Sequence, residues 1–295
     1  MSICRLLRSL KAASTVFVFL LSFQAPALGA EIEIDGELFE VNRVNQHVLI
    51  ASQSFGTTRI NFGIVVGSDE VVLISSMMRR NTQSVEKLVR HVSGKPIKKV
   101  LVIDSDPFHH HGSSYFRDRG ATIIGHENLI AQGVKIDISF SDELLIDVGT
   151  ETIRMTHSAA HTLDHVFVTL ESSNLVFAGD ALRNDWLIYA GPNGWPAHIS
   201  ALRGIVAERP DSTMYVPGNR GQKVSSSAAE LNEIIGIYEG FSKLSQRLAS
   251  EGLSAEETAN HQEIQTLLQR LERYDEFSTY TVHHVEDVLK KHDTL

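Results

Sequence analysis

Residues 95–127 read KPIKKVLVIDSDPFHHHGSSYFRDRGATIIGHE, and the predicted fold rests on this stretch. The wholly apolar run at 100–103 predicts a strand that is buried on both faces. A loop rich in aspartate and histidine follows and leads into a short helix, after which residues 122–124 predict another strand. Polar side chains therefore gather where a buried strand ends.

Short strands alternate with helices on both sides of this stretch. Residues 82–93 predict a helix, because Val85, Leu88 and Val89 share one helical face and Gly94 ends it. Other segments predict strands at 38–43, 48–51, 60–67, 71–74 and 214–216. Two hairpins are predicted, one from 144–148 and 152–155 and one from 166–170 and 176–178. Further helices are predicted from about Glu127 and at 199–208. This order suits two sheets packed face to face with helices outside, an α/β (α+β) arrangement.

The last seventy residues have a helical character. Residues 225–249 and 255–273 predict two long amphipathic helices joined by a turn at Gly252, and 281–291 predicts a final helix. Ser254 followed by Glu257 is a capping-box pattern, which predicts a helix start. The exposed pattern of these helices permits a homodimer without requiring one.

Residues 1–30 resemble a secretory signal peptide. Arg5, Arg8 and Lys11 precede an uncharged run at 12–23, and small residues with one proline follow it. A transmembrane helix needs about 20 apolar residues, so this run is short for one, although an uncleaved N-terminal anchor is the alternative. We therefore expect a periplasmic or secreted protein without membrane attachment after cleavage.

The charge and the cysteine content restrict partners and chemistry. The formal net charge is −9, and loss of the leader leaves 24 basic against 36 acidic residues, or −12. An acidic chain is a poor binder of nucleic acid or of anionic membranes. Cys4 is the sole cysteine and lies in the leader, so the mature chain is predicted to have neither a disulfide nor thiolate chemistry.

Five segments follow one another in the order typical of the metallo-β-lactamase superfamily, which the chain resembles over residues 38–222. They are VVGSDEVVLISS at 65–76, the quoted stretch at 95–127, THSAAHTLDHVFV at 156–168, LVFAGDAL at 175–182 and MYVPGNRG at 214–221. The resemblance implies a four-layer αββα sandwich at 31–223, with a helical region at 224–295 packed on or beside it.

The metal motif H-x-H-x-D-H of that family is degenerate here. Asp104 and Asp106 stand where the family has its first two histidines, Phe108 stands where it has aspartate, and His109 keeps the last histidine. An alternative register would use His109 and His111 as the H-x-H pair, but it lacks the D-H that should follow.

The remaining family positions are partly kept. His161 matches the lone metal histidine of the third segment, and Asp180 matches the bridging aspartate of the fourth. Asn219 stands where the family has its final histidine, and Ser75 replaces an aspartate of the first segment. Because Phe108 has no lone pair to donate and Asn219 is a neutral ligand, we expect no stable second ion.

The predicted site therefore holds one divalent metal. Its ligands are taken from the retained or substituted motif positions: Asp104, Asp106, His109, His161 and Asp180. The resemblance implies zinc, whereas the carboxylate-rich set suits manganese, iron or magnesium. His109 and Asp180 are the predicted catalytic residues, with His109 acting as a ligand or proton shuttle.

Plainer explanations stay open for these residues. Asp104 and Asp106 are also compatible with a turn before Pro107, and His109 is compatible with a solvated loop that binds no metal. His161 is also compatible with a buried histidine of structural role. His157 and His165 are expected to support the site or lie on the surface, and solvated faces are expected for His126, His198, His261, His283, His284 and His292. Trp186, Tyr189 and Trp195 are expected either to line a substrate pocket or to pack in the core.

The resemblance implies hydrolysis of an ester, amide, lactam or thioester bond in a small molecule. Phosphate esters are disfavoured because no basic cluster adjoins the motif in the sequence. A catalytically inactive pseudoenzyme that serves as a periplasmic binding protein, without a metal, is the alternative, since four ligand positions are replaced. A mononuclear iron oxygenase that uses Asp106, His161 and Asp180 is a third hypothesis.

Overall fold

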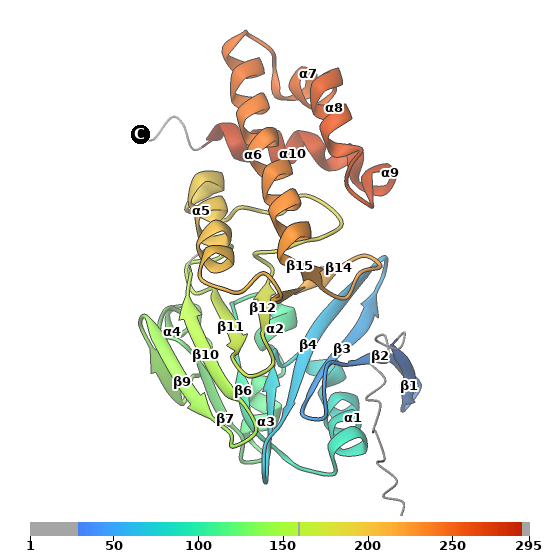
Figure 1. Ribbon diagram of the computed structural model, residues 1–295, viewed down its shortest axis with the longest axis vertical. Coiled ribbons are helices and arrows are strands. Elements are labelled where there is room, and N and C mark those ends of the chain that lie inside the picture. Colours follow the sequence, from blue (N-terminus) through green and yellow to red (C-terminus); the bar gives the residue numbers. More distant parts are fainter. Residues whose placement is uncertain (1–28, 159, 291–295) are drawn as a thin grey trace, which may run out of the picture.

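A computed structural model describes residues 29–158 and 160–290, so Cys4, His292 and nearly all of the expected signal segment lie outside it. Figure 1 shows two β-sheets side by side, with a helical region stacked at one end. The first sheet contains β1 (Ala30–Ile34), β2 (Glu37–Arg43), β3 (Val48–Phe55), β4 (Thr58–Val66), β5 (Val71–Ile74), β6 (Ile97–Leu101), β7 (Thr122–His126) and β8 (Ile138–Phe140) in that order, and β14 (Asn219–Arg220) pairs with β4.

The second sheet has the order β15-β13-β12-β11-β10-β9. Its strands are β9 (Glu143–Asp147), β10 (Thr152–His157), β11 (Val166–Leu170), β12 (Leu175–Gly179), β13 (Met214–Pro217) and β15 (Ser226–Ser227). Both sheets contain parallel neighbours, β5 beside β6 in the first and β12 beside β13 in the second. Parallel pairing brings the carboxyl ends of those strands to a common edge.

Side-chain alternation along the strands separates the apolar layers. In β5, Val71 and Leu73 face the helices outside the first sheet, whereas Val72 and Ile74 face the second sheet. Successive side chains of a strand point to opposite faces, so a strand that is apolar at every position is buried on both sides. This arrangement explains the uninterrupted apolar runs that the sequence shows at β5 and β6.

Helices cover both outer faces. On the first sheet lie α1 (Thr82–Ser93), α3 (Ser113–Arg117) and α4 (Asn128–Ala131), while α5 (Gly194–Ala207) and α6 (Ala228–Ser250) cover the second sheet. The short α2 (Pro107–His110) and η1 (Arg79–Asn81) lie in loops. The predicted four-layer αββα sandwich is therefore confirmed.

The C-terminal helices pack on α6 and extend the outer layer (Figure 1). They are α7 (Ala255–Ala259), α8 (Gln262–Leu268), α9 (Tyr274–Phe277), η2 (Ser278–Tyr280) and α10 (Thr281–Lys290). The capping box of Ser254 and Glu257 is confirmed at the start of α7. Within residues 29–158 and 160–290, no helix has the length and apolar character needed to cross a lipid bilayer.

One helix prediction in this region is wrong. The single helix expected at 255–273 is broken, because α7 ends at Ala259 and His261 adopts an extended backbone that starts α8. The His261 ring accepts a hydrogen bond from the backbone N–H of Glu263 and so caps the new helix. Ala259 and Ile264 still pack in the same core, which is why the apolar spacing resembled one continuous helix.

Candidate metal centre

Five predicted ligands meet at the rim of the sandwich, at the ends of strands from both sheets. Asp104 follows β6, Asp106 precedes α2, and His109 lies within α2. His161 belongs to the loop between β10 and β11, and Asp180 immediately follows β12. Side chains from three separate loops, at 104–109, 161 and 180, are thus brought together by the stacking of the two sheets.

The first group of ligand atoms is buried and comprises Asp104, His109 and Asp180. His109 Nε2 lies 3.3 Å from Asp180 Oδ1 and 4.0 Å from Asp104 Oδ2. The other ring nitrogen, Nδ1, lies 2.9 Å from Ser75 Oγ, which holds the ring in place. Ser75 thus supports a ligand from the position where the family has an aspartate.

The second group comprises Asp106, His161 and Asp180, so Asp180 is shared. His161 Nε2 lies 3.1 Å from Asp106 Oδ2, and His161 Nδ1 lies 2.9 Å from the carbonyl oxygen of Tyr189. Both partners are acceptors, so both ring nitrogens must carry protons to satisfy them. Without a metal, His161 is therefore an imidazolium.

The electrostatics of the site agree with this protonation. Burial alone would lower the pKa of His161, but the hydrogen bond to Asp106 and the charge of Asp180 raise it to about 10. Burial opposes the charge on His109 in the same way, yet Asp104 and Asp180 raise the pKa of that ring to about 9.

The pKa values of Asp104 and Asp180 are shifted in opposite directions because the surroundings of the two carboxylates differ. Burial raises the pKa of Asp104 to about 7, and repulsion from Asp180 adds to it, while attraction to His109 opposes the shift. Burial would also raise the pKa of Asp180, but the charges of His109 and His161 hold it below its usual value. Asp180 is thus the permanent anion of the centre.

The residues fit a divalent cation. Asp104 Oδ2 and His109 Nε2 are buried and find no hydrogen-bond partner among the described residues. In each of the two groups, the three ligand atoms lie within 4.8 Å of one another. Buried polar atoms are nearly always satisfied, and a cation between them would satisfy both orphaned atoms at once.

Two substituted family positions are occupied in ways that do not add ligands. Phe108 packs edge-on against Phe55, with the ring centroids 4.9 Å apart, within the apolar layer outside the first sheet. Asn219 donates a 2.7 Å hydrogen bond from Nδ2 to Asp180 Oδ1 and so orients that carboxylate.

The alternative register, which pairs His109 with His111 as the H-x-H motif, is wrong, because His111 is exposed and lines a separate surface hollow with Arg117.

Close backbone approach shapes the loop beside Asp180. A side chain at Gly218 would place its Cβ 2.1 Å from Asp180 Oδ1, so only glycine fits there. The next two residues form β14, and the fully buried Arg220 bonds to Asn61, Ser52 and Glu40 on neighbouring strands. This arginine anchors to the first sheet the loop that carries Asn219.

A cavity of about 390 Å³ opens beside the centre. His161, Asp180 and Asn219 form its floor, and its walls are Arg183, Trp186, Leu187, Ile188, Tyr189, Phe277, Tyr280, His283 and His284. The pocket prediction for Trp186 and Tyr189 is therefore confirmed. Trp195 follows the other alternative, since it is buried in the helical core against Tyr238 and Phe241.

Three basic side chains line the cavity: Arg183 and two histidines of α10, His283 and His284. His283 is exposed, as expected, whereas His284 is partly buried, so the expectation of a solvated face is wrong for His284. Arg183 is already paired, since its guanidinium makes two bonds of 3.0 and 2.9 Å to the buried Asp185. The cavity therefore contains no uncommitted arginine among the described residues.

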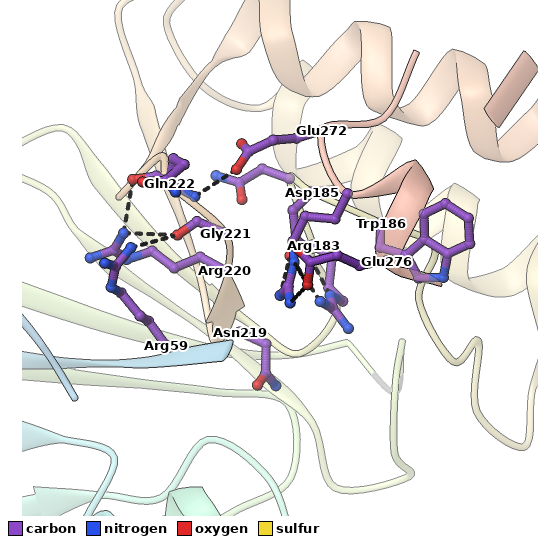
Figure 2. A network of polar contacts seen from close by, with 12 residues as sticks. Arg59, Arg183, Asp185, Trp186, Asn219, Arg220, Gly221, Gln222, Glu272 and Glu276 are labelled. Carbon is purple, nitrogen blue, oxygen red and sulfur yellow. Dashed lines mark hydrogen bonds and ion pairs between the residues drawn. The ribbon is translucent and has the colours of Figure 1, made fainter. Parts of the chain in front are cut away.

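A polar network joins the helical region to the sandwich next to the cavity (Figure 2). Arg273 binds Oδ2 of Asp185, the same oxygen that Arg183 Nη2 bonds, and Glu276 in turn pairs with Arg273. Glu272 accepts a 2.9 Å hydrogen bond from the backbone N–H of Gln222. The network sets the position of the C-terminal segment relative to the loop that carries Asn219.

The other histidines near the centre have structural roles. His165 is fully buried, with its ring nitrogens 2.6 Å from Ser158 Oγ and 3.0 Å from the carbonyl of Ala178. His126 and His157 stack with their ring centroids 3.8 Å apart. His126 and His198 are both buried, so the expectation of a solvated face is wrong for these two residues.

Solved metallo-β-lactamase structures share this architecture. The metallo-β-lactamase from Pontibacter korlensis superposes with a TM-score of 0.61 at 16% sequence identity, covering 68% of this chain and 99% of that one. This chain has the metallo-β-lactamase fold. The metallo-β-lactamase IND-7 gives a TM-score of 0.58 at 17% identity, with 67% and 98% covered.

A third metallo-β-lactamase, from Erythrobacter litoralis with β-mercaptoethanol in its active site, gives a TM-score of 0.59 at 16% identity, with 71% of this chain and 99% of that one covered. No family model and no curated protein matches the chain. The predicted resemblance is thus confirmed as a metallo-β-lactamase fold, and about a third of this chain lies outside the superpositions.

Proposed function

We propose that this chain is an exported metal-dependent hydrolase that acts on an ester, amide, lactam or thioester bond through a single divalent ion. One observation carries the proposal. Two buried polar atoms, Asp104 Oδ2 and His109 Nε2, lack hydrogen-bond partners among the described residues and lie beside Asp180 at the floor of a cavity. A structural core would normally have replaced or satisfied them.

Asp104, His109 and Asp180 would hold the ion, with Asp106 and His161 adjacent as further ligands. Three carboxylates with two imidazoles suit zinc, manganese or iron. Such an ion supplies an acidified water and polarises a carbonyl oxygen. His109 is fully buried and does not line the cavity, which favours a ligand role over a proton-shuttle role.

The pair of His161 and Asp106 is better placed to handle protons. His161 faces the cavity, and the side chain of Asp106 is 40% exposed, so a substrate can reach both. The carbonyl of Tyr189 holds the Nδ1 proton of His161, which leaves Nε2 as the nitrogen that gains or gives a proton. Asn219 keeps the carboxylate of Asp180 in a fixed orientation through its hydrogen bond.

Metal analysis of the mature protein tests the proposal. After purification in the presence of zinc, manganese or iron, we expect about one equivalent of ion by mass spectrometry. Asp104→Asn should lower the affinity by on the order of 100-fold, because it removes a buried charged ligand. Asp118→Asn, an equally conservative change at an exposed position, should leave the affinity unchanged. Absence of stoichiometric metal under all three conditions rejects the hydrolase.

The binding-protein alternative has one observation in its favour. The imidazolium of His161 and the carboxylate of Asp106 already form an ion pair at 3.1 Å, so part of the charge is balanced without a metal. A pseudoenzyme would retain this pair, bind no ion, and show no turnover that depends on Asp180. Asp180→Ala separates the two candidates, since lost turnover supports the enzyme.

A further inference from the structure

We propose that the cavity formed by the C-terminal segment selects substrates with an uncharged alkyl or aryl group next to the reacting bond. The inference rests on the proposed function only for the location of that bond. It concerns the walls contributed by α9, η2 and α10, which lie opposite the loop after β12. The C-terminal segment thus becomes the specificity element of the protein.

Six of the residues that form the walls have aliphatic or aromatic side chains: Trp186, Leu187, Ile188, Tyr189, Phe277 and Tyr280. Trp186, Leu187 and Ile188 are buried to within 2% of complete burial and present one wall. Phe277 packs against Trp186, with the ring centroids 6.0 Å apart, and continues this apolar surface. Such a surface favours apolar ligands, because burying a polar group against it without a hydrogen bond is costly.

The rim carries two exposed aromatic rings. Tyr189 is 57% exposed and Tyr280 is 54% exposed, and both line the cavity. Exposed aromatic rings beside a hollow lose unfavourable contact with water when an apolar group covers them. The cavity adjoins His161 and Asp180, so the group that covers these rings is the part of the substrate next to the reacting bond.

The positive charge of Arg183, which lines the cavity, is already neutralised. Arg183 makes two hydrogen bonds to Asp185, and its guanidinium carbon lies 5.2 Å from the centre of the Phe277 ring. Arg273 approaches the same ring at 4.2 Å and also pairs with Asp185. The two arginines therefore hold Phe277 in place (Figure 2 shows Arg183 and Asp185) and do not offer a free site for a carboxylate or phosphate.

The volume of the cavity limits the size of the substrate group that it can hold. At about 390 Å³, the cavity accommodates a chain or ring system of about ten heavy atoms, since a water molecule takes ~30 Å³ of liquid. Each methylene buried there should tighten binding by about fourfold. Affinity should therefore rise steadily with chain length until the cavity is full.

Binding of methyl ketones tests the proposal without metal and without turnover. The ketones 2-butanone, 2-hexanone and 2-octanone carry a carbonyl but no hydrolysable bond. The chain has two tryptophans, of which Trp186 lines the cavity and Trp195 lies in the core, so a Trp195→Phe protein reports cavity occupancy through the emission of Trp186. Calorimetry on the unmodified protein gives the same Kd independently, should the Trp195→Phe protein fail to fold.

The expected result is saturable binding with a Kd that falls about fourfold per methylene. Tyr280→Ala and Phe277→Ala should weaken 2-octanone binding by about tenfold and flatten the dependence on chain length. Leu145→Ala removes an apolar side chain of matching exposure (53%) from β9, away from the cavity, and should leave the Kd unchanged.

The proposal is overturned by absence of saturable binding in calorimetry, by a Kd independent of chain length, or by equal effects of Leu145→Ala and Tyr280→Ala. These results differ from failure of the proposed function. A protein that binds the ketone series but holds no metal keeps its apolar pocket and loses the hydrolase. A protein that holds metal and hydrolyses esters without preference for chain length keeps the hydrolase and loses the specificity pocket.

Discussion

Asp180 connects the two halves of the candidate centre, because one carboxylate serves both groups of ligand atoms. Three features hold it: the strand end at Gly179, the hydrogen bond from Asn219 and the close approach of Gly218. The charges of His109 and His161 keep it ionised, since they lower its pKa. The centre thus depends on one buried anion whose orientation is set by neighbours rather than by its own loop.

Gly218→Ala tests this dependence. The added methyl group would lie 2.1 Å from Asp180 Oδ1, so the carboxylate or the loop must move. We expect metal affinity to fall by at least about tenfold, with a loss of about 1–3 kcal/mol in the free energy of unfolding. Titration calorimetry and urea unfolding measure the two effects.

Gly204→Ala is the matched control. Gly204 lies within α5, and a Cβ there meets no atom within 4 Å, so the same change should leave metal binding intact. It should also stabilise the protein by about 0.5–1 kcal/mol, because alanine favours helix over glycine. Equal losses of metal affinity in the two variants would show that Gly218 has no special role.

The pH dependence of stability follows from the two histidines. A group whose pKa rises on folding contributes stability that is complete below its unfolded pKa, about 6.5 for histidine, and is lost as the pH rises through its folded pKa. His109 and His161 have folded values of about 9 and about 10. With a chelator present, we expect the free energy of unfolding to fall between pH 7 and pH 9 by at least about 1 kcal/mol per pH unit.

A bound metal should change this behaviour, because it needs neutral imidazoles and replaces their protons. Affinity for zinc should therefore increase with pH over the same interval, by up to about tenfold per pH unit for each proton released. Calorimetry in two buffers of different ionisation enthalpy counts those protons. If neither the free energy of unfolding nor the zinc affinity changed between pH 7 and pH 9, the rings of His109 and His161 would be neutral in the metal-free protein.

The helix α6 is the element that joins the sandwich to its C-terminal region. It spans 23 residues, covers the second sheet and packs against α5, α7, α8 and α10. Ser227 caps its first turn, since its side chain accepts a hydrogen bond from the backbone N–H of Glu230, while the carboxylate of Glu230 accepts one from the backbone N–H of Ser227. The helix therefore begins at a defined residue immediately after β15.

Ser227→Ala should destabilise the protein by about 1 kcal/mol, the usual effect of losing a helix cap. Urea unfolding followed by circular dichroism measures it. Ser225→Ala makes the same change two residues earlier, outside the cap, and should have an effect below about 0.5 kcal/mol. Indistinguishable results for the two variants would contradict the proposed importance of the cap.

The largest apolar cluster lies between the second sheet and the helices that follow it. It combines Val176 and Tyr215 of the sheet with residues of α5, α6, α8 and α10. The outer face of the second sheet would therefore be exposed if those helices were absent. For this reason we do not expect the domain predicted at 31–223 to fold without the region at 224–295.

A chain ending at residue 223 tests this expectation. We predict that it is insoluble or lacks a cooperative unfolding transition, because it exposes a large apolar surface. Co-expression of residues 224–295 as a separate chain should restore solubility by covering the sheet again. A soluble, cooperatively folding fragment 31–223 would instead establish the sandwich as an independent domain.

Local pattern was sufficient for much of the fold. The helix α1 coincides with its prediction at 82–93, because one apolar stripe ends at a glycine in a left-handed conformation. The region 255–273 shows the limit of this reasoning, since a histidine cap at His261 interrupted an unbroken apolar spacing. The order of five motifs placed Asp104, Asp106, His109, His161 and Asp180 at strand ends, and the structure brings them together.

The chain's own residue order thus determines the layers, the strand ends and the identities of the candidate ligands, because periodicity and loop placement act over a few residues. The cavity is different. Phe277, Tyr280 and His284 line the cavity beside Asp180 only because the chain after α6 comes back toward the loop that follows β12. Packing between elements about a hundred residues apart leaves no local trace in the sequence, so the pocket and its selectivity come from the folded arrangement alone.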